Sequence, residues 1–208
     1  IIKKIFDKKS PPILIAEISA NHIGSLKNAK KLILTAKKNG ADLVKLQTYE
    51  PRNMTINSSQ KDFLVKDGLW KGYKLWDLYK EAQTPLKWQK ELFSYAKKIK
   101  IPCFSTPYDD EGVDLLKKLN CKLYKVSSFE MKDSSLVKKI CSIGKPVIIS
   151  TGLANLKEIS EVYKVAKKSG CKKLVLLYCV SSYPAKIKDF NLNNIEILQK
   201  KFKCEIGF

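Results

Sequence analysis

Two lysines lie within short apolar runs, where a charged side chain is unusual. Lys45 lies in the run LVKL and Lys125 in the run LYKV. A buried ammonium group is costly unless it meets an anion, so two such lysines with nearby hydroxyls predict a receptor for phosphate and carboxylate groups. Two alternatives stay open. The lysines can face outward with their ammonium groups in solvent, or one of them can act through a Schiff base.

Hydroxyl and carboxyl side chains follow other apolar runs in the same way. Ser150-Thr151-Gly152 comes between an apolar run and an expected helix, and hydroxyls with a glycine at the start of a helix suit an anion. Glu17 and Glu130 also follow apolar runs, so each can serve as an acid, a base or a metal ligand. The simpler alternative for either glutamate is a salt bridge to a neighbouring lysine.

Composition restricts histidine and cysteine chemistry. His22 is the only histidine, which rules out a histidine-rich metal site and leaves no conventional Ser-His-Asp triad. The six cysteines form no C-x-x-C pair, which disfavours zinc and redox sites. Cys103 and Cys179 lie in apolar runs, so we expect small buried thiols in a reducing cytoplasm.

Alternating helices and strands must position these residues. An amphipathic helix that ends in lysine is followed by glycine or asparagine and then by a short apolar strand, and this unit recurs along the chain. Nearly continuous apolar strands are typical of parallel sheets covered on both faces. We therefore predict an α/β fold, with strands at 13–17, 42–47, 101–105, 122–127, 146–150 and 174–179 and a seventh opening at 205–208.

Residues at the helix ends support these boundaries. Glycine follows three expected helices, where a left-handed residue is common, at Gly40, Gly144 and Gly170. Ser25 is expected to cap the helix that follows it, and Pro85 to occupy a first helical position. Asn155 with Glu158 predicts a capping box.

Polar residues follow every predicted strand, which favours a (β/α)8 TIM barrel over a doubly wound sheet. A barrel collects residues from the ends of many strands into one mouth, whereas a doubly wound sheet concentrates its site at one switch point. Residues 1–208 would then be one partial barrel domain, with about the first six βα units and the start of strand seven. The one long irregular stretch, at about 50–80, is expected to be a functional loop or a small subdomain.

The chain is strongly basic, with a formal net charge of +20. A basic chain can bind nucleic acid, but Arg52 is the only arginine, and base reading favours the guanidinium group. We expect a solvated lysine surface and no nucleic acid partner, with a lysine-rich nucleic-acid-binding protein as the alternative.

No apolar run reaches the ~18 residues of a membrane span. The start lacks an initiator Met and a signal-peptide apolar region, so we expect a clipped start and a cytoplasmic protein.

Six segments resemble the sialic acid synthases, the family that makes nine-carbon nonulosonic acids. They match in order along nearly the whole chain, at IAEISANHIGSL (15–26), ADLVKLQTY (41–49), FSTPYD (104–109), YKVSSFE (124–130), GKPVIISTG (144–152) and YCVSSYPA (178–185). The stretch at 68–89 looks more like the pseudaminic acid synthases than the N-acetylneuraminate synthases.

The resemblance implies an enzyme that condenses phosphoenolpyruvate with an open-chain N-acetylated amino sugar. A divalent metal, Mn or Mg, would polarise the sugar aldehyde, and phosphate would leave by C–O cleavage without a Schiff base. By motif position, the phosphoenolpyruvate contacts would be Lys45, Thr106, Lys125, Ser128, Ser150 and, less closely, Ser181. Glu17 resembles the carboxylate near the reacting carbons, and Gln47, Glu130 and Tyr183 resemble sugar contacts. Glu17 and Glu130 are thus the expected catalytic carboxylates.

The family pattern also implies parts that this sequence does not contain. The family's metal ligands lie beyond Phe208, so no metal ligand is expected in residues 1–208. Its C-terminal antifreeze-like (SAF) domain, from which an arginine reaches the partner subunit's site in a homodimer, is not present either. We therefore expect the 208 residues by themselves to be inactive. Trp70 and Trp76 are expected either to wall the sugar side of the site or simply to anchor their loop.

Overall fold

The computed structural model describes residues 1–7, 9–182 and 184–208, where short strands alternate with helices. The chain divides into two compact units. Residues 11–121, with Ile1, form the first unit, which holds β1 (Ile15–Glu17), β2 (Leu43–Thr48) and β3 (Cys103–Pro107). Residues 2–10 and 122–208 form the second unit, which holds β4 (Tyr124–Val126), β5 (Val147–Ser150), β6 (Leu174–Leu177) and β7 (Glu205–Gly207).

Each unit is built on a parallel sheet. In the first, β2 pairs with β1 and β3. In the second, β4 to β7 pair in sequence order. Parallel neighbours need a crossover connection, and helices provide it in both units. The predicted α/β class is confirmed, and the predicted strands begin and end within two residues of the observed ones.

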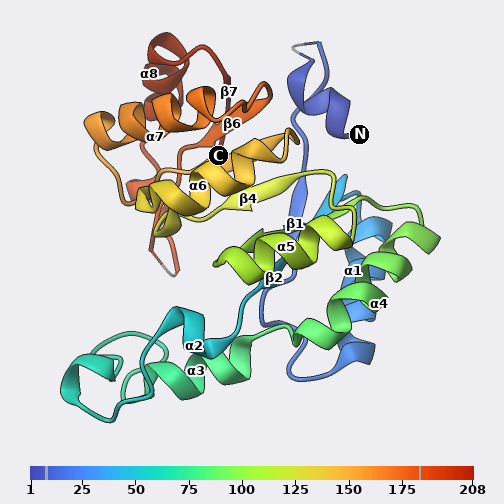
Figure 1. Cartoon of the computed structure of the whole chain (residues 1–208), viewed down its shortest axis with the longest axis vertical. Coiled ribbons are helices and arrows are strands. Elements are labelled where there is room, and N and C mark those ends of the chain that lie inside the picture. The colour runs from blue at the N-terminus through green and yellow to red at the C-terminus, as the bar shows by residue number, and fades with distance from the viewer. Residues whose placement is uncertain (8, 183) are drawn as a thin grey trace. The chain divides into compact units, whose positions relative to one another are not determined.

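Helices α1 (Leu26–Lys38) and α4 (Leu86–Lys98) cover one face of the first unit's sheet (Figure 1). Val44 and Leu46 of β2 are fully buried beneath them, in one cluster with Ala29, Ile33, Leu92 and Ala96. Successive side chains of a strand alternate between the two faces. Lys45 and Gln47 therefore lie on the face that these helices leave free. A third helix, α5 (Asp110–Lys118), packs along β3.

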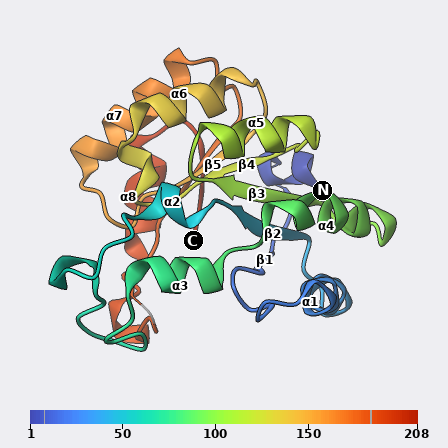
Figure 2. The same cartoon turned by 60° about the horizontal axis from the view of Figure 1, so that its bottom comes forward.

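The stretch at about 50–80 is more regular than predicted. It contains α2 (Pro51–Met54), the 3-10 helix η2 (Lys61–Phe63) and the first part of α3 (Leu75–Ala82). Figures 1 and 2 show α2 and α3 side by side. A single turn such as α2 shows no periodicity in the sequence, which is why the stretch was expected to be irregular. Within it Trp70 is 45% exposed.

The second unit carries α6 (Ser134–Ser142), α7 (Leu156–Lys168) and α8 (Asn193–Lys201). Helices α6 and α7 pack against each other (Figure 2). Its 3-10 helices are η1 (Ile2–Phe6), η3 (Glu130–Lys132) and η4 (Ile187–Asp189). Lys132 of η3 forms an ion pair of 2.7 Å with Glu158 of α7. This pair ties the segment after β4 to the start of α7.

Most of the predicted helix ends are confirmed. Gly40, Gly144 and Gly170 have φ values of 89°, 72° and 88°. Asn120, the predicted asparagine in the copy of the unit at 116–128, has a φ of 57°, and Lys100, in a looser copy at 95–106, has a φ of 59°. The recurring turn is therefore set by the chain path after each helix and not by glycine alone.

Two predicted helix caps are present, and one prediction is corrected. The Ser25 hydroxyl accepts a hydrogen bond from the Asn28 N–H, and Asn155 forms the capping box with Glu158. Pro85 has a ψ of 132° and lies one residue before α4. Its carbonyl accepts a hydrogen bond of 2.8 Å from the Trp88 N–H, so Pro85 caps the helix and does not open it.

All six cysteines are free thiols. Three of them are buried as predicted, at Cys121, Cys141 and Cys171. The other three are half-buried. Among the described residues, no helix is both long enough and apolar enough to cross a membrane.

Candidate active site

The first unit places four predicted site residues on one face of its sheet. The strand register sets Glu17 of β1 opposite Lys45 of β2, and Gln47 of β2 opposite Thr106 of β3. The Lys45 ammonium forms an ion pair with the Glu17 carboxylate and donates to the Thr106 hydroxyl at 3.3 Å. The Lys45 side chain is only 13% exposed. The alternative in which the Lys45 side chain faces outward into solvent is therefore wrong.

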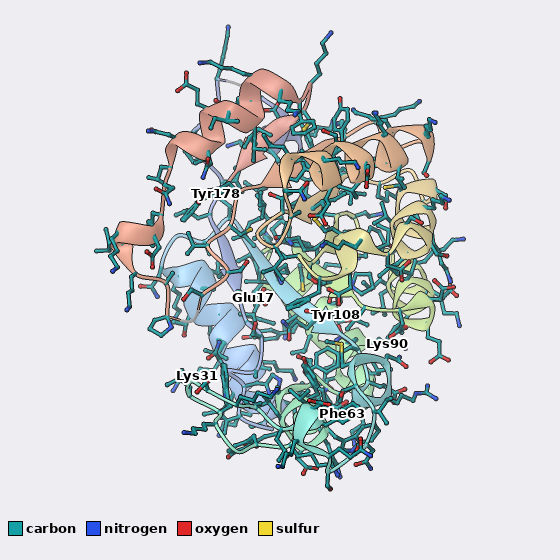
Figure 3. All side chains as sticks on the ribbon, turned by 90° about the vertical axis from the view of Figure 1, so that its left-hand side faces the viewer. Glu17, Lys31, Phe63, Lys90, Tyr108 and Tyr178 are labelled. Atoms are coloured by element: carbon teal, nitrogen blue, oxygen red, sulfur yellow. The ribbon has the colours of Figure 1, made fainter. Side chains whose placement is uncertain are left out.

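The Glu17 carboxylate is held from two sides. It pairs with Lys45 and also accepts a hydrogen bond of 3.0 Å from the Ser19 N–H. Ser19 has a φ of 41°, a left-handed conformation that is uncommon for serine. Figure 3 shows Glu17 on β1, away from Lys31 on the exposed side of α1. The salt-bridge alternative for Glu17 is thus realised within the site, where the carboxylate lies beside a cation and a hydroxyl.

Lys125 is the central cation of the second unit's group. Its side chain is buried, with the residue 7% exposed. Its ammonium donates to the Val126 carbonyl at 2.7 Å and to the Ser150 hydroxyl. The strand register explains the second contact, because Lys125 lies opposite Ile148, two residues before Ser150 on the same face. A buried cation favours the arrival of an anion, so this arrangement suits an anionic ligand.

Gly152 brings further hydroxyls to the same place. Its N–H donates to the Ser128 hydroxyl at 3.2 Å. A Cβ atom built on Gly152 would overlap the Ser181 hydroxyl and lie 2.9 Å from the Cβ of Cys179. The Cys179 thiol in turn lies 3.4 Å from the Ser150 hydroxyl. The chain after β5 and the chain after β6 therefore approach as closely as the absence of a side chain allows.

The Ser150-Thr151-Gly152 run differs from its prediction in two respects. Helix α7 begins at Leu156, so the run belongs to the turn before the helix and not to its start. Thr151 has a structural role, since its hydroxyl donates to the Leu177 carbonyl at 2.9 Å. Ser150 and Gly152 are the members of this run that face the other predicted site residues.

Glu130 begins η3, just after the turn that follows β4. Burial raises the pKa of its carboxyl group above the ordinary value, and the nearby positive charge of Lys125 opposes that shift. Its Oε2 atom is buried and has no hydrogen-bond partner among the described residues. Glu130 therefore takes up a proton more readily than an exposed glutamate does, which suits a general acid.

The remaining predictions have mixed outcomes. Tyr183 lies outside the described residues. His22 is fully buried, and its pKa is lowered by burial. Its Nδ1 accepts from the Gly24 N–H at 3.2 Å, and its Nε2 lies 3.3 Å from the Thr84 hydroxyl. Its role is structural. In the described ranges, no group of three or more His, Cys, Asp or Glu residues is arranged to hold a metal ion.

Two residues near these groups were not identified from the sequence. Ser127 is the last residue of the predicted strand at 122–127 and has no predicted role, yet its hydroxyl is buried without a hydrogen-bond partner among the described residues. Cys179 was expected only to fill the core, but its thiol contacts Ser150. The position of Ser127 at the end of an apolar strand was the available signal. For Cys179 there was none, because its contact joins two different strands.

Known proteins share this arrangement of elements. The NeuB family profile matches residues 32–208. Pseudaminic acid synthase of Campylobacter jejuni is 43% identical over 202 residues, which cover 97% of this chain and 59% of the relative. N,N'-diacetyllegionaminic acid synthase of the same species is 38% identical over 199 residues, which cover 94% and 59%.

A solved structure of a sialic acid synthase also resembles this chain in fold. The N-acetylneuraminic acid synthetase of Leptospira borgpetersenii, crystallised with citrate, superposes with a TM-score of 0.84 at 29% identity. The match covers 96% of this chain and 65% of that one. The predicted resemblance to the sialic acid synthases, and to pseudaminic acid synthases in particular, is confirmed. The chain spans 59% of the length of the two curated relatives named above.

Proposed function

Because the chain belongs to the NeuB family, we propose that it condenses phosphoenolpyruvate with an N-acetylated amino sugar and releases phosphate. The product is a nine-carbon nonulosonic acid, of the pseudaminic type. The similarity to pseudaminic acid synthases supports that choice of product.

The observation that carries the proposal is the buried Lys125 with its surrounding hydroxyls. The Lys125 ammonium bonds to Ser150, and Ser128 and Ser181 lie against Gly152 in the same unit. A buried cation beside several hydroxyl donors suits a phosphate or carboxylate group, because charge-assisted hydrogen bonds are the strong ones. We assign the binding of phosphoenolpyruvate to these residues together with Lys45 and Thr106.

The two glutamates differ in environment, which suggests different roles. The Glu17 carboxylate lies in an ion pair with Lys45 and accepts a hydrogen bond from the Ser19 N–H. We propose that it takes the proton from the water that adds to C2. Burial favours the neutral form of Glu130, so we propose that it donates a proton to the sugar oxygen. Gln47 and Tyr183 are proposed sugar contacts.

The proposed reaction forms one carbon–carbon bond and breaks one carbon–oxygen bond. The C3 carbon of phosphoenolpyruvate bonds to the aldehyde carbon, whose oxygen takes up a proton. Water then adds to the oxocarbenium carbon C2 and loses a proton. The C2–O bond to the phosphate then breaks as the new C2 hydroxyl becomes the ketone carbonyl, and phosphate leaves with the bridging oxygen and takes up the hydroxyl proton. The family also leads us to propose that the strands belong to a (β/α)8 barrel. A homodimer, a cytoplasmic location and a requirement for Mn or Mg stay predictions.

Because residues 1–208 by themselves are expected to be inactive, the test is an assay of the purified full-length protein with phosphoenolpyruvate labelled with oxygen-18 at the bridging position. A panel of acetamido sugars serves as the second substrate, and products are weighed by mass spectrometry. We expect a nonulosonic acid and labelled inorganic phosphate, with the highest turnover for a deoxy diacetamido sugar. Unlabelled phosphate would contradict C–O cleavage. A borohydride-trapped adduct of a keto acid on Lys45 or Lys125 would favour the Schiff-base aldolase instead.

A further inference from the structure

Two polar side-chain atoms in the turn after β4 are buried without a hydrogen-bond partner among the described residues. They are the Ser127 hydroxyl oxygen and Oε2 of Glu130. The turn is closed by a hydrogen bond of 3.1 Å from the Met131 N–H to the Ser127 carbonyl. Folded proteins rarely leave buried polar atoms unsatisfied, and two in one turn call for a ligand or an ordered water.

The turn lies within the group of residues that we assign to the substrates. Ser128, between the two atoms, accepts a hydrogen bond from the Gly152 N–H. Lys125, two residues before Ser127, donates to Ser150. Lys125 and Ser128 thus both have partners within the protein, while the Ser127 hydroxyl and Glu130 Oε2 have none among the described residues. The same turn also presents Phe129, a large apolar side chain that is 78% exposed.

We propose that Ser127 and Glu130 form an amide-binding subsite for an N-acetyl group of the sugar, with Ser127 as a specificity-determining residue. The Ser127 hydroxyl donates to the acetamido carbonyl, and Glu130 Oε2 accepts from the acetamido N–H, while the other oxygen of the neutral Glu130 carboxyl carries the proton that goes to the sugar oxygen. Phe129 offers an apolar surface to the acetyl methyl. An amide supplies one donor and one acceptor, and it satisfies both buried atoms without bringing in a charge. This inference rests on the proposed function.

The unsatisfied state of Ser127 makes its removal informative. A hydroxyl that supports the fold loses a partner when it is replaced, and the protein loses stability. The Ser127 hydroxyl has no such partner in the described residues, so alanine removes an unsatisfied polar group. A ligand-binding role therefore predicts unchanged or higher stability together with weaker sugar binding. A merely structural role does not produce this combination.

The experiment compares Ser127→Ala with Ser142→Ala in the purified full-length protein. Ser142 is an exposed serine of α6 whose hydroxyl donates to the Lys139 carbonyl. The substrates are the acetamido sugar with the highest turnover and its analogue with a hydroxyl in place of one acetamido group. We expect Ser127→Ala to raise KM for the acetamido sugar about three- to tenfold. We expect no rise in KM for phosphoenolpyruvate or for the hydroxyl analogue that lacks the bound acetamido group. We also expect no fall in Tm.

Each outcome separates the two proposals. If the unsubstituted protein condenses no sugar, the proposed function fails and the subsite with it. If the unsubstituted protein condenses sugars, two results refute only the subsite. One is an unchanged KM for the acetamido sugar in Ser127→Ala. The other is an equal rise in KM for the acetamido sugar and for its hydroxyl analogue, whichever acetamido group the analogue lacks. A drop in Tm with unchanged discrimination would assign Ser127 to the fold. Ser142→Ala should match the unsubstituted protein in every measurement.

Discussion

One added methyl group at Gly152 tests the close approach that assembles the second unit's group. A Cβ atom at this position would lie 2.9 Å from the Cβ and 3.2 Å from the carbonyl oxygen of Cys179, and it would overlap the Ser181 hydroxyl. Gly152 is not among the residues with positive φ. The glycine is therefore required for space, and Gly152→Ala must push the chain after β6 away from the turn after β5.

The expected magnitude follows from these contacts. Overpacking of this kind costs about 1–3 kcal/mol of unfolding free energy. The shift also moves Ser181 and strains the hydrogen bond from the Gly152 N–H to Ser128. Ser128 and Ser181 are proposed contacts of phosphoenolpyruvate, and losing one hydrogen bond to a charged ligand costs roughly 1.5–3 kcal/mol of binding free energy. We therefore expect Gly152→Ala to weaken phosphoenolpyruvate binding at least tenfold.

The assay is titration calorimetry with phosphoenolpyruvate, with urea unfolding of the same samples. Gly170→Ala is the matched control, since Gly170 has a φ of 88° and open space around it. A left-handed alanine costs about 1–2 kcal/mol, so this control loses similar stability at a position before β6, whereas Cys179 and Ser181 follow that strand. Wild-type affinity in Gly152→Ala would refute the reasoning. So would an equal loss of affinity in both variants, because the effect would then follow stability alone.

Three further predictions concern other contacts. Lys45→Ala and Lys125→Ala should each raise KM for phosphoenolpyruvate roughly ten- to a hundredfold, as expected for losing a charge-assisted contact of about 1.5–3 kcal/mol; unchanged kinetics in both variants would contradict their assignment. His22 should titrate below its ordinary pKa of 6.5. Its folded form therefore binds the proton more weakly than the unfolded form, and stability should fall as pH drops below about 6.5. As the only histidine, it gives a single ring signal in NMR, and a midpoint at or above 6.5 would oppose this. Asn155→Ala should lower the unfolding free energy by about 1 kcal/mol through loss of the capping box, and an unchanged Tm would show that the cap contributes little.

The fold was predictable because its signals are local. Each strand is a short apolar run, and each helix end carries a lysine followed by a left-handed residue, so Gly40 and Gly170 mark boundaries directly. Asn120 follows the same rule with asparagine, and Lys100 shows its limit, since it adopts the left-handed conformation with neither glycine nor asparagine. Helix α2 was missed because four residues carry no periodic pattern.

Residue type and position at a strand end predicted which residues belong to the site, but not which way their side chains point or which partners they contact. The sequence left open whether Lys45 faces solvent, because a lysine between apolar neighbours is compatible with either face of a sheet. Packing decides it: Val44 and Leu46 occupy the face covered by α1 and α4, which leaves Lys45 beside Glu17 and Thr106. The ion pair with Glu17 depends on strand register, which no local pattern reveals.

The features that sequence reasoning missed share one physical cause. The clearance at Gly152 is a distance between the chain after β5 and the chain after β6, and the unsatisfied state of Ser127 is a property of everything that surrounds its hydroxyl. Both are relations between segments, so neither has a signature within its own segment. Such relations decide which of many serines can meet a ligand. Ser128 and Ser150 already bond within the protein, so a ligand there shares or replaces an existing hydrogen bond, whereas the buried Ser127 hydroxyl, unsatisfied among the described residues, gains a new one.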